Sequence, residues 1–509
     1  MILNRQEYRN KVLGCWMGKN IGGTLGAPFE WRRQVNNVSF YTQDLHGEPL
    51  PNDDLDIQLL WLVAMEEQGV EVNAQMLGEY WLLYVTPHWA EYGNAKVNMR
   101  AGLLPPLSGT VNNPYKDSCG SFIRSEIWAC VAPGNPRLAA QYAYEDAIID
   151  HGSGEGTYAE VFTAVLESAA FVVNDIPTLI EVGLSYIPET CAVAGAVRLA
   201  AECYRDGQSW REARDTVLEK YRGSAAGNDP RNVSPEDQQK GFGEGKLGWD
   251  VPSNIGMLLI GLLYGGGDFA RTVCTAVNCG EDTDCTGATA GSIFGIIHGL
   301  GAIPEAWIAP VGRKIKTACL NLGELGYFGG QLPADIDNLT DRTELVARQV
   351  SARFKPPVVV DDGPTDLSGL QVEDLKIGLL AQTLYASLNG PQFRYDFFDV
   401  GVDYGDAPTI RDNTPKTIRL RVRNKYKVQA NINLRWYAPE SWQVLPSRQG
   451  QFFIFVHNVA DNPRELVFTL QTGRVEGSLV RLAVELTIDG RPTVMLVPIT
   501  LVNGNLQPE

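Results

Sequence analysis

The sequence lacks paired cysteines. Its nine cysteines are an odd number, and no two of them are spaced as Cys-x-x-Cys. Disulfide frameworks and structural zinc sites both depend on such pairs. The sequence therefore argues against a disulfide-stapled or zinc-stapled fold and predicts reduced thiols.

Long apolar runs are also absent. The longest near-continuous one, residues 255–264, is about half of the roughly 20 residues that a membrane helix needs. The first ten residues, MILNRQEYRN, are polar and include Glu7, which is unlike a secretory signal. We therefore expect no membrane partner and a cytoplasmic location.

Positive charge is scarce, and its shortage is uneven. The chain of 509 residues carries a net charge of −17. Residues 1–365 hold 45 acidic and 28 basic residues, whereas residues 366–509 hold 15 of each. An acidic surface repels phosphate backbones, so no nucleic-acid partner is expected. All nine cysteines also lie in the first part, which indicates at least two units of different chemistry.

Two kinds of periodicity divide the chain. Ala-rich segments with helical spacing occur before residue 355, and Gly and Pro clusters separate them. After the proline-rich segment 355–364 the pattern alternates as in strands, for example over residues 417–423 and 479–488. We predict a helical domain over residues 1–355, a connector over 356–398, and an all-β, Ig-like sandwich over 399–509.

Glycine recurs every four residues near the N-terminus, at Gly14, Gly18, Gly22 and Gly26. This spacing places all four on one stripe of a helix. The stripe predicts a second helix packed very closely against the first.

Two acidic clusters are candidate metal-binding sites. Asn52-Asp53-Asp54-Leu55-Asp56 and Gly280-Glu281-Asp282-Thr283-Asp284 each precede an apolar helix. Helix capping explains one acidic residue at such a position. Three within five residues exceed that need, and a shared divalent cation would relieve their repulsion.

Four motifs, in order, resemble those of the ADP-ribosylglycohydrolase family over about residues 8–345. The segment from Gly14 to Glu30 resembles the family's opening helix, which ends Gly-Asp-Ala-Leu-Gly-Ala-Pro-Phe-Glu. Residues 52–54 resemble its Thr-Asp-Asp motif, and residues 280–285 its Gly-Gly-Asp-Thr-Asp-Thr motif. Residues 146–151 are similar to the segment that supplies a pocket histidine. The resemblance implies an all-α catalytic domain around a two-metal site that binds Mg²⁺ or Mn²⁺.

The resemblance also implies the metal ligands. By position they are Asn52, Asp53, Asp54, Asp282, Asp284 and Cys285. Asn52 and Cys285 stand where the family has threonine, and Gly23 stands where it has aspartate. A soft thiol is an unusual substitute for a hydroxyl ligand, so Thr286 or Asp56 could compensate, or one metal position could be weak or absent.

The remaining site residues follow from the same resemblance. Glu30 matches the glutamate beside the scissile bond, and Asp54 is the second expected catalytic carboxylate. A helix-capping role for Glu30 and a purely structural role for His151 stay open. The expected substrate-binding residues are Gly120, Ser121, Arg124, His151, Trp249 and Asp250.

The expected reaction is metal-dependent hydrolysis at the anomeric carbon of a ribofuranose, on a small-molecule or protein-linked substrate. An ADP-ribosyl N- or O-glycosidic bond is the first hypothesis. A non-phosphorylated pentofuranoside is the second, because residues 118–124 match the family's phosphate loop only in part. A catalytically inactive binding or structural protein is the third. The oligomeric state is left open, a homo-oligomer included.

Overall fold

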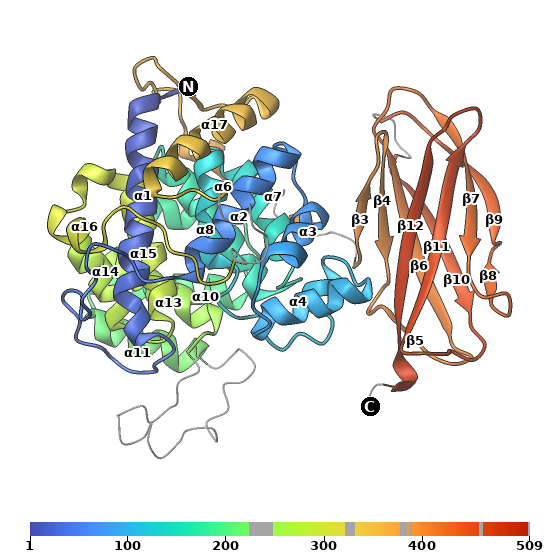
Figure 1. Cartoon of the computed structure of the whole chain (residues 1–509), viewed down its shortest axis with the longest axis horizontal. Coiled ribbons are helices and arrows are strands. Elements are labelled where there is room, and N and C mark those ends of the chain that lie inside the picture. The colour runs from blue at the N-terminus through green and yellow to red at the C-terminus, as the bar shows by residue number, and fades with distance from the viewer. Residues whose placement is uncertain (223–247, 321–330, 377–383, 386–388, 458–461, 507–509) are drawn as a thin grey trace. The chain divides into compact units, whose positions relative to one another are not determined.

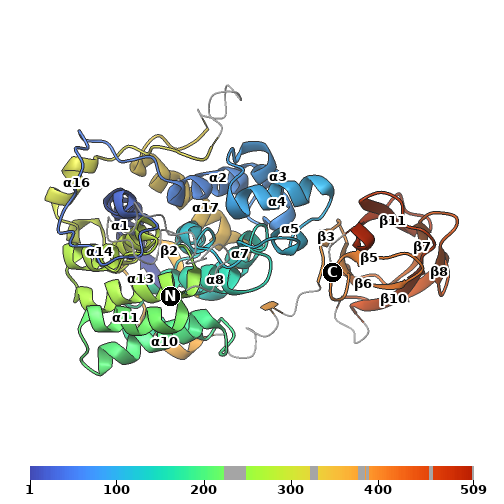
Figure 2. The same cartoon turned by 90° about the horizontal axis from the view of Figure 1, so that it is seen from below.

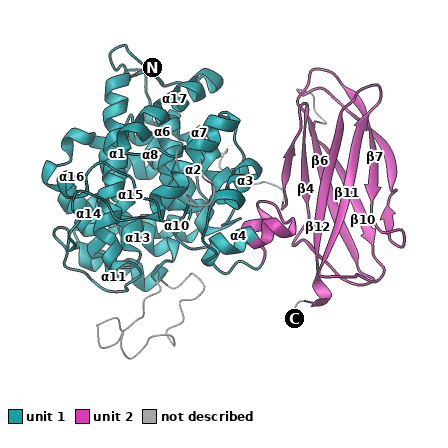
Figure 3. Ribbon diagram, viewed as in Figure 1, with its two compact units in different colours: residues 1–96, 112–385 teal, residues 97–111, 386–509 magenta. Residues whose placement is uncertain are grey.

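The structure, a computed structural model, describes residues 1–222, 248–320, 331–376, 384–385, 389–457 and 462–506. It contains two compact units, which we describe separately (Figure 3). Unit 1 comprises residues 1–96 and 112–385, and unit 2 comprises residues 97–111 and 386–509. The chain thus contributes a short internal segment, residues 97–111, to the second unit.

Unit 1 is helical, as predicted. Its helices are α1 (Arg5–Gly26), α2 (Asp53–Gln68), α3 (Ala74–Tyr84), α6 (Glu126–Val131), α7 (Pro136–Ala147), α8 (Glu155–Ala170), α9 (Ile176–Leu184), α10 (Ala192–Arg205), α11 (Trp210–Tyr221), α13 (Val251–Gly265), α14 (Phe269–Asn278), α15 (Thr283–His298), α16 (Glu305–Val311), α17 (Ile336–Phe354) and α18 (Val372–Leu375). Helix α4 (Ala90–Ala101) begins in unit 1, and its last turn belongs to unit 2. No helix among the described residues is long and apolar enough to cross a membrane.

Helices α1 and α15 lie side by side and antiparallel in unit 1 (Figure 1). A Cβ added to Gly18 would lie 2.0 Å from the carbonyl oxygen of Gly291, and one added to Gly22 would lie 2.0 Å from that of Gly287. The close helix contact predicted from the glycine repeat is therefore confirmed. At its end the Thr283 hydroxyl donates a 2.8 Å hydrogen bond to the Gly26 carbonyl. This packing brings the end of α1 to the start of α15.

A small parallel sheet joins the N-terminus of unit 1 to the segment that follows α17. Strand β1 (Ile2–Asn4) pairs with β2 (Val359–Asp361), with Leu3 opposite Val360. Part of the segment expected to be a connector is thus hydrogen-bonded to the N-terminus.

Unit 2 is a sandwich of two five-stranded sheets. One has the order β3-β4-β6-β10-β8 and the other β5-β12-β11-β7-β9. Its strands are β3 (Gln392–Arg394), β4 (Phe398–Asp403), β5 (Thr409–Ile410), β6 (Pro415–Asn424), β7 (Ala430–Tyr437), β8 (Gln443–Leu445), β9 (Gln449–Ile454), β10 (Arg464–Gln471), β11 (Leu479–Ile488) and β12 (Val494–Asn503). Figure 2 shows β7 and β11 on one side and β6 and β10 on the other.

The alternating strand pattern explains the sandwich. Along β6, Ile418, Leu420 and Val422 are buried, and the residues between them are more exposed. Strand β10 pairs with β6 so that Leu466 lies opposite Leu420. The core of unit 2 also contains Leu103, which lies between α4 and the short helix α5 (Leu107–Thr110). The predicted fold class, helices followed by a β-sandwich, is confirmed.

Candidate metal centre and active site

Three segments far apart in sequence meet where α1 ends and where α2 and α15 begin. Glu30 directly follows the 3₁₀ turn η1 (Ala27–Phe29) at the end of α1. Asp54 lies in the first turn of α2, and Asp284 lies in the first turn of α15. The free N–H groups at a helix start favour negative charge. The N-termini of α2 and α15 therefore meet, and both favour the negative charge of the carboxylates that lie there.

Two groups of ligand atoms share Asp284. One group is formed by Asp54, Asp284 and Cys285, and the other by Glu30, Asp282 and Asp284. Within each group the ligand atoms lie within 4.8 Å of one another. The tertiary structure thus brings together the two acidic clusters and the glutamate that the sequence analysis singled out.

Several carboxylate oxygens in these groups have no hydrogen-bond partner. Asp54, Asp282 and Asp284 are 1%, 3% and 4% exposed. Both oxygens of Asp54 and the Oδ1 atoms of Asp282 and Asp284 are buried and unpartnered among the described residues. A buried carboxylate without a partner is costly. These oxygens are the hard donors that Mg²⁺ and Mn²⁺ prefer, so the residues fit a divalent cation.

The pKa values of these groups reflect the same crowding. Burial raises the pKa of Asp54, Asp282 and Asp284 well above the usual range, and nearby acidic groups raise it further. Burial, with Asp53 and Asp54 nearby, also raises the pKa of Glu30 to about 8. A bound cation would oppose both effects.

Asn52 and Asp53 hold the start of α2 in place. The Asn52 side-chain oxygen accepts a 2.8 Å hydrogen bond from the Asp54 amide and so caps the helix. Its amide group lies over Gly23 of α1. Asp53 accepts a 3.3 Å hydrogen bond from the Tyr92 hydroxyl. Asn52 therefore has a capping role, and its expected role as a ligand stays a prediction.

Of the two residues that could compensate for Cys285, both have other partners. The Oδ2 atom of Asp56 accepts hydrogen bonds from the backbone amides of Ala318 and Cys319, whereas its Oδ1 atom is buried and has no partner among the described residues. The Thr286 hydroxyl donates to the backbone oxygen of Asp282. Cys285 itself is buried, and it interacts with a second buried thiol, Cys119.

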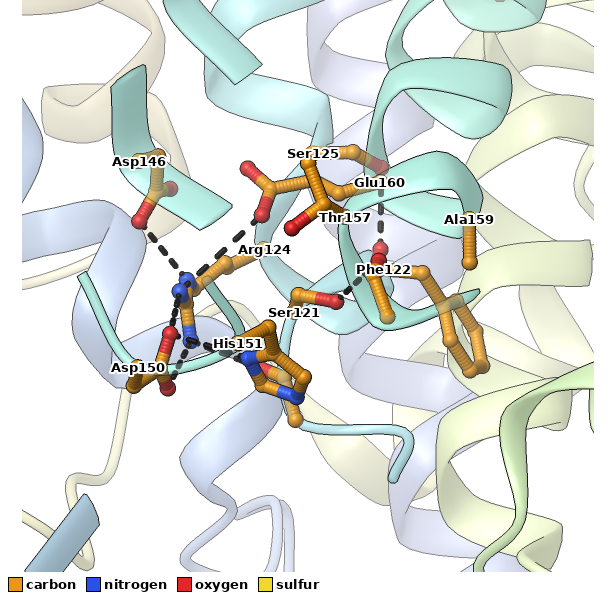
Figure 4. A network of polar contacts seen from close by, with 12 residues as sticks. Ser121, Phe122, Arg124, Ser125, Asp146, Asp150, His151, Thr157, Ala159 and Glu160 are labelled. Carbon is orange, nitrogen blue, oxygen red and sulfur yellow. Dashed lines mark hydrogen bonds and ion pairs between the residues drawn. The ribbon is translucent and has the colours of Figure 1, made fainter. Parts of the chain in front are cut away.

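The segment expected to contact substrate is held by a buried ion network (Figure 4). Arg124 donates to Asp146 at 2.9 Å and to Asp150 at 2.6 Å and 3.0 Å. It also donates to the backbone oxygen of Gly120 at 2.7 Å. The Ser121 hydroxyl donates to the Gly156 carbonyl at 2.7 Å. The Arg124 side chain is fully buried, so the structure shows it positioning the loop, and its expected substrate contact stays a prediction.

His151 belongs to the same network. Its Nδ1 lies 2.9 Å from Asp150 Oδ1, and its Nε2 lies 3.3 Å from the Ser118 hydroxyl. Burial disfavours the charged imidazole, but Asp150 raises the pKa of His151 above its usual value. Although burial alone would raise the pKa of Asp150, Arg124 and His151 lower it to about 2. His151 is thus enclosed by protein groups.

Trp249 and Asp250 lie beside the same loop. Asp250 forms a backbone bridge with Ser118, and its carboxylate accepts a 2.6 Å hydrogen bond from the Ser253 hydroxyl. The Trp249 ring contacts Trp31 edge-to-face with 5.5 Å between centroids. Trp31 directly follows Glu30 and is 44% exposed. The two rings form an apolar surface next to the acidic groups.

Sequence reasoning did not single out four residues near this site: Lys19, Trp31, Tyr92 and Cys119. Lys19 is fully buried and pairs with Glu126 at 2.7 Å. A lysine within the apolar, glycine-spaced helix is a signal that could have identified it. Tyr92 and Cys119 have no local signal, because only the fold brings them near Asp53 and Cys285.

Among the comparisons with known proteins, the family match is the informative one. No curated protein matches the chain. Among solved structures, a FixG-related protein from Vibrio parahaemolyticus matches with 14% identity and a TM-score of 0.18, covering 22% of this chain and 99% of the other. The ADP-ribosylglycohydrolase family matches over residues 4–347, which include both acidic clusters and Glu30. The chain therefore belongs to the ADP-ribosylglycohydrolase family.

Proposed function

We propose that this protein is a metal-dependent hydrolase that cleaves a glycosidic bond at the anomeric carbon of a ribofuranose, with an ADP-ribosyl N- or O-glycosidic bond as the first candidate. The observation that carries the proposal is the group of buried, unpartnered carboxylate oxygens next to the half-buried Glu30. Family membership supports hydrolysis as the reaction class.

Asp53, Asp54, Asp282 and Asp284, with Asn52, would hold Mg²⁺ or Mn²⁺, and the two ligand groups provide for two ions. When bound, such cations polarise sugar hydroxyls and lower the pKa of bound water. The protein's own contribution is to fix these carboxylates at two helix starts before any ligand arrives.

Glu30 is the proposed general acid and base. In the metal-free protein, burial and the neighbouring carboxylates raise the pKa of Glu30 to about 8, which is the direction that a proton donor to the leaving group needs. After bond cleavage, the same carboxylate can accept a proton from the attacking water. Asp54, whose two oxygens lack partners, is proposed to orient that water.

The neighbouring residues would bind the substrate. The backbone of Gly120 and Ser121 is held in place by Arg124 and Gly156, so it offers a rigid edge to the sugar. Trp249 is proposed to pack on the apolar face of the substrate, and Asp250 to orient it. His151 would act on the loop through Ser118.

One observation favours a substrate that carries phosphate. Arg33, Arg214 and Arg222 line a cavity of about 600 Å³, which Asp215 and Glu219 also line. The three arginines lie within 4.0 Å of the buried carboxylate of Glu281, which directly precedes Asp282. Guanidinium groups are well suited to bind phosphate. This favours the ADP-ribosyl candidate.

Another observation favours a non-phosphorylated pentofuranoside. Arg124, the cation of the expected phosphate loop, is paired with Asp146 and Asp150 inside the protein. We therefore keep a nucleoside or a pentofuranosyl glycan as the second candidate.

A substrate screen distinguishes the candidates. ADP-ribosyl-arginine, ADP-ribosyl-serine, ADP-ribose 1″-phosphate, nucleosides and p-nitrophenyl pentofuranosides are incubated with the protein, with and without Mg²⁺ or Mn²⁺. Release of ADP-ribose supports the first candidate, and release of free pentose supports the second. Absence of metal-dependent turnover on all of them contradicts the proposed activity and favours an inactive member.

A matched pair of variants tests Glu30. Glu30→Gln is expected to lower kcat by about 100-fold or more, as for loss of a general acid and base, while metal affinity stays close to that of the wild type. Glu79→Gln, at an exposed position of α3, is the control and should leave kcat unchanged. A Glu30→Gln variant with the parental rate would exclude Glu30 as the acid and base.

A further inference from the structure

The two ligand groups differ in the chemistry of their atoms. The group of Asp282 and Asp284, with Glu30 beside them as the proposed acid and base, offers oxygen only. The group of Asp54, Asp284 and Cys285 offers two carboxylates and a sulfur. Oxygen ligands suit Mg²⁺ and Mn²⁺, whereas sulfur favours softer cations such as Zn²⁺.

The sulfur-containing group has the features of a ligand site beyond the cysteine itself. Asp54 is 1% exposed, and neither of its carboxylate oxygens has a hydrogen-bond partner. Cys119, a second buried thiol, interacts with Cys285 and with Asp282. Two carboxylates and one thiol are a donor set that Zn²⁺ accepts.

A third group of potential ligands provides a contrast. The ligand atoms of Glu91, Asp150 and His151 are also buried and within 4.8 Å of one another. There, however, Asp150 is already paired with Arg124 and His151. The Asp54 group is different because both carboxylate oxygens of Asp54 and the Oδ1 atom of Asp284 are unpartnered among the described residues.

We propose that the metal centre is mixed: the oxygen-only position takes Mg²⁺ or Mn²⁺, and the position at Asp54, Asp284 and Cys285 selects a softer divalent cation such as Zn²⁺. Binding breaks the S–H bond of Cys285, forms a metal–sulfur bond and releases one proton to the solvent. This inference rests on the metal centre of the proposed function, and it deepens that proposal by assigning a different cation to each position.

Cobalt spectroscopy tests the sulfur ligand without any need for turnover. The metal-free full-length protein is titrated with Co²⁺ alone, and absorption is recorded for a thiolate-to-cobalt charge-transfer band in the near ultraviolet. The wild type is expected to show the band. Cys285→Thr, which introduces a hydroxyl, is expected to lose it. A wild type that binds Co²⁺ without the band overturns the proposal.

Competition calorimetry gives the selectivity. In the presence of excess Mg²⁺, the wild type is expected to bind one Zn²⁺ per chain. Cys285→Thr is expected to bind Zn²⁺ at least tenfold more weakly and Mg²⁺ about equally well. Cys191→Ser is the matched control, because Cys191 is a buried helix cap whose sulfur accepts a hydrogen bond from Ala194, and serine is a preferred cap. Equal Zn²⁺ affinity in the wild type and Cys285→Thr overturns the proposal.

X-ray absorption of the zinc-loaded wild type covers the case in which Cys285→Thr does not fold. A sulfur neighbour about 2.3 Å from zinc is expected. A shell of oxygen and nitrogen only contradicts the mixed centre but leaves the proposed hydrolase intact if Mg²⁺ or Mn²⁺ still binds. If no divalent cation binds, both proposals are wrong.

Discussion

The side-chain amide of Asn52 lies directly over Gly23. A Cβ added to Gly23 would come within 2.2 Å of the Asn52 Nδ2 atom, so the space that Asn52 occupies exists only because residue 23 has no side chain. The family motif has aspartate at the position of Gly23 and threonine at the position of Asn52. The two departures from the motif are therefore structurally coupled.

This coupling predicts a non-additive effect. Gly23→Asp is expected to displace Asn52 from its cap on α2 and to weaken Mn²⁺ binding at least tenfold. The double variant Gly23→Asp with Asn52→Thr is expected to recover most of that loss, which corresponds to an interaction energy of about 1–3 kcal/mol. Mn²⁺ calorimetry on the wild type, both single variants and the double variant measures it. Additive effects of the two substitutions would contradict the coupling.

The acidic groups predict that metals stabilise the protein more at high pH. In the metal-free protein, burial raises the pKa of Asp54, Asp282 and Asp284 above the value of about 4 in the unfolded chain. Between those values the folded state holds more protons than the unfolded state, so the free energy of unfolding falls as the pH rises. Cations bind the ionised carboxylates and reverse this loss.

Thermal unfolding of the metal-free protein and of the protein saturated with Mn²⁺ checks this expectation. The rise in Tm caused by Mn²⁺ should be larger near pH 8 than near pH 5.5, because fewer protons must be displaced. Asp282→Ala should largely remove the difference between the Mn²⁺-induced rises in Tm at the two pH values. An Mn²⁺-induced rise in Tm that is independent of pH would show that cations bind elsewhere.

The contact between α1 and α15 predicts a large packing cost. Gly18→Ala places a methyl group against the Gly291 backbone, which cannot move as a flexible side chain can. The expected loss is about 1–3 kcal/mol of unfolding free energy or more, together with weaker metal binding, because α15 carries Asp284. Gly301→Ala is the control, since a Cβ there meets no atom within 4 Å. Denaturant unfolding of both variants gives the comparison.

The buried network predicts that Arg124 matters for stability. Arg124→Met would leave Asp146 and Asp150 buried without their cation, which is expected to cost about 3–5 kcal/mol. The partly exposed pair of Arg313 and Asp337 is the control, and Arg313→Ala should cost about 1 kcal/mol or less. If Arg124→Met is as stable as the wild type yet binds substrate poorly, the substrate contact expected from the sequence is favoured instead.

Much of the fold could be predicted because its signals are local. Helical spacing within unit 1 and alternation within strands such as β6 depend on neighbouring residues. The glycine repeat of α1 even indicated its close packing. Residues 97–111 belong to unit 2 without any change of composition that marks them, because membership in a core depends on contacts distant in sequence.

The candidate site, too, has features that the sequence predicts and features that it does not. The motifs around Glu30, Asp54 and Asp284 could be recognised from the sequence, since each is a short segment at a helix end. The partners of Arg124 and His151 could not be predicted, because a single sequence does not show whether a buried cation faces a ligand or a carboxylate of its own fold.

The sequence by itself determined the family, the order of helices and strands, and the concentration of acidic charge in residues 1–365. Only the tertiary structure decided that Asp284 belongs to two ligand groups, and that one of them includes Cys285. The physical reason is the packing of α1 on α15 and the capping of α2 by Asn52. These long-range contacts convert two local acidic motifs into one shared, buried centre.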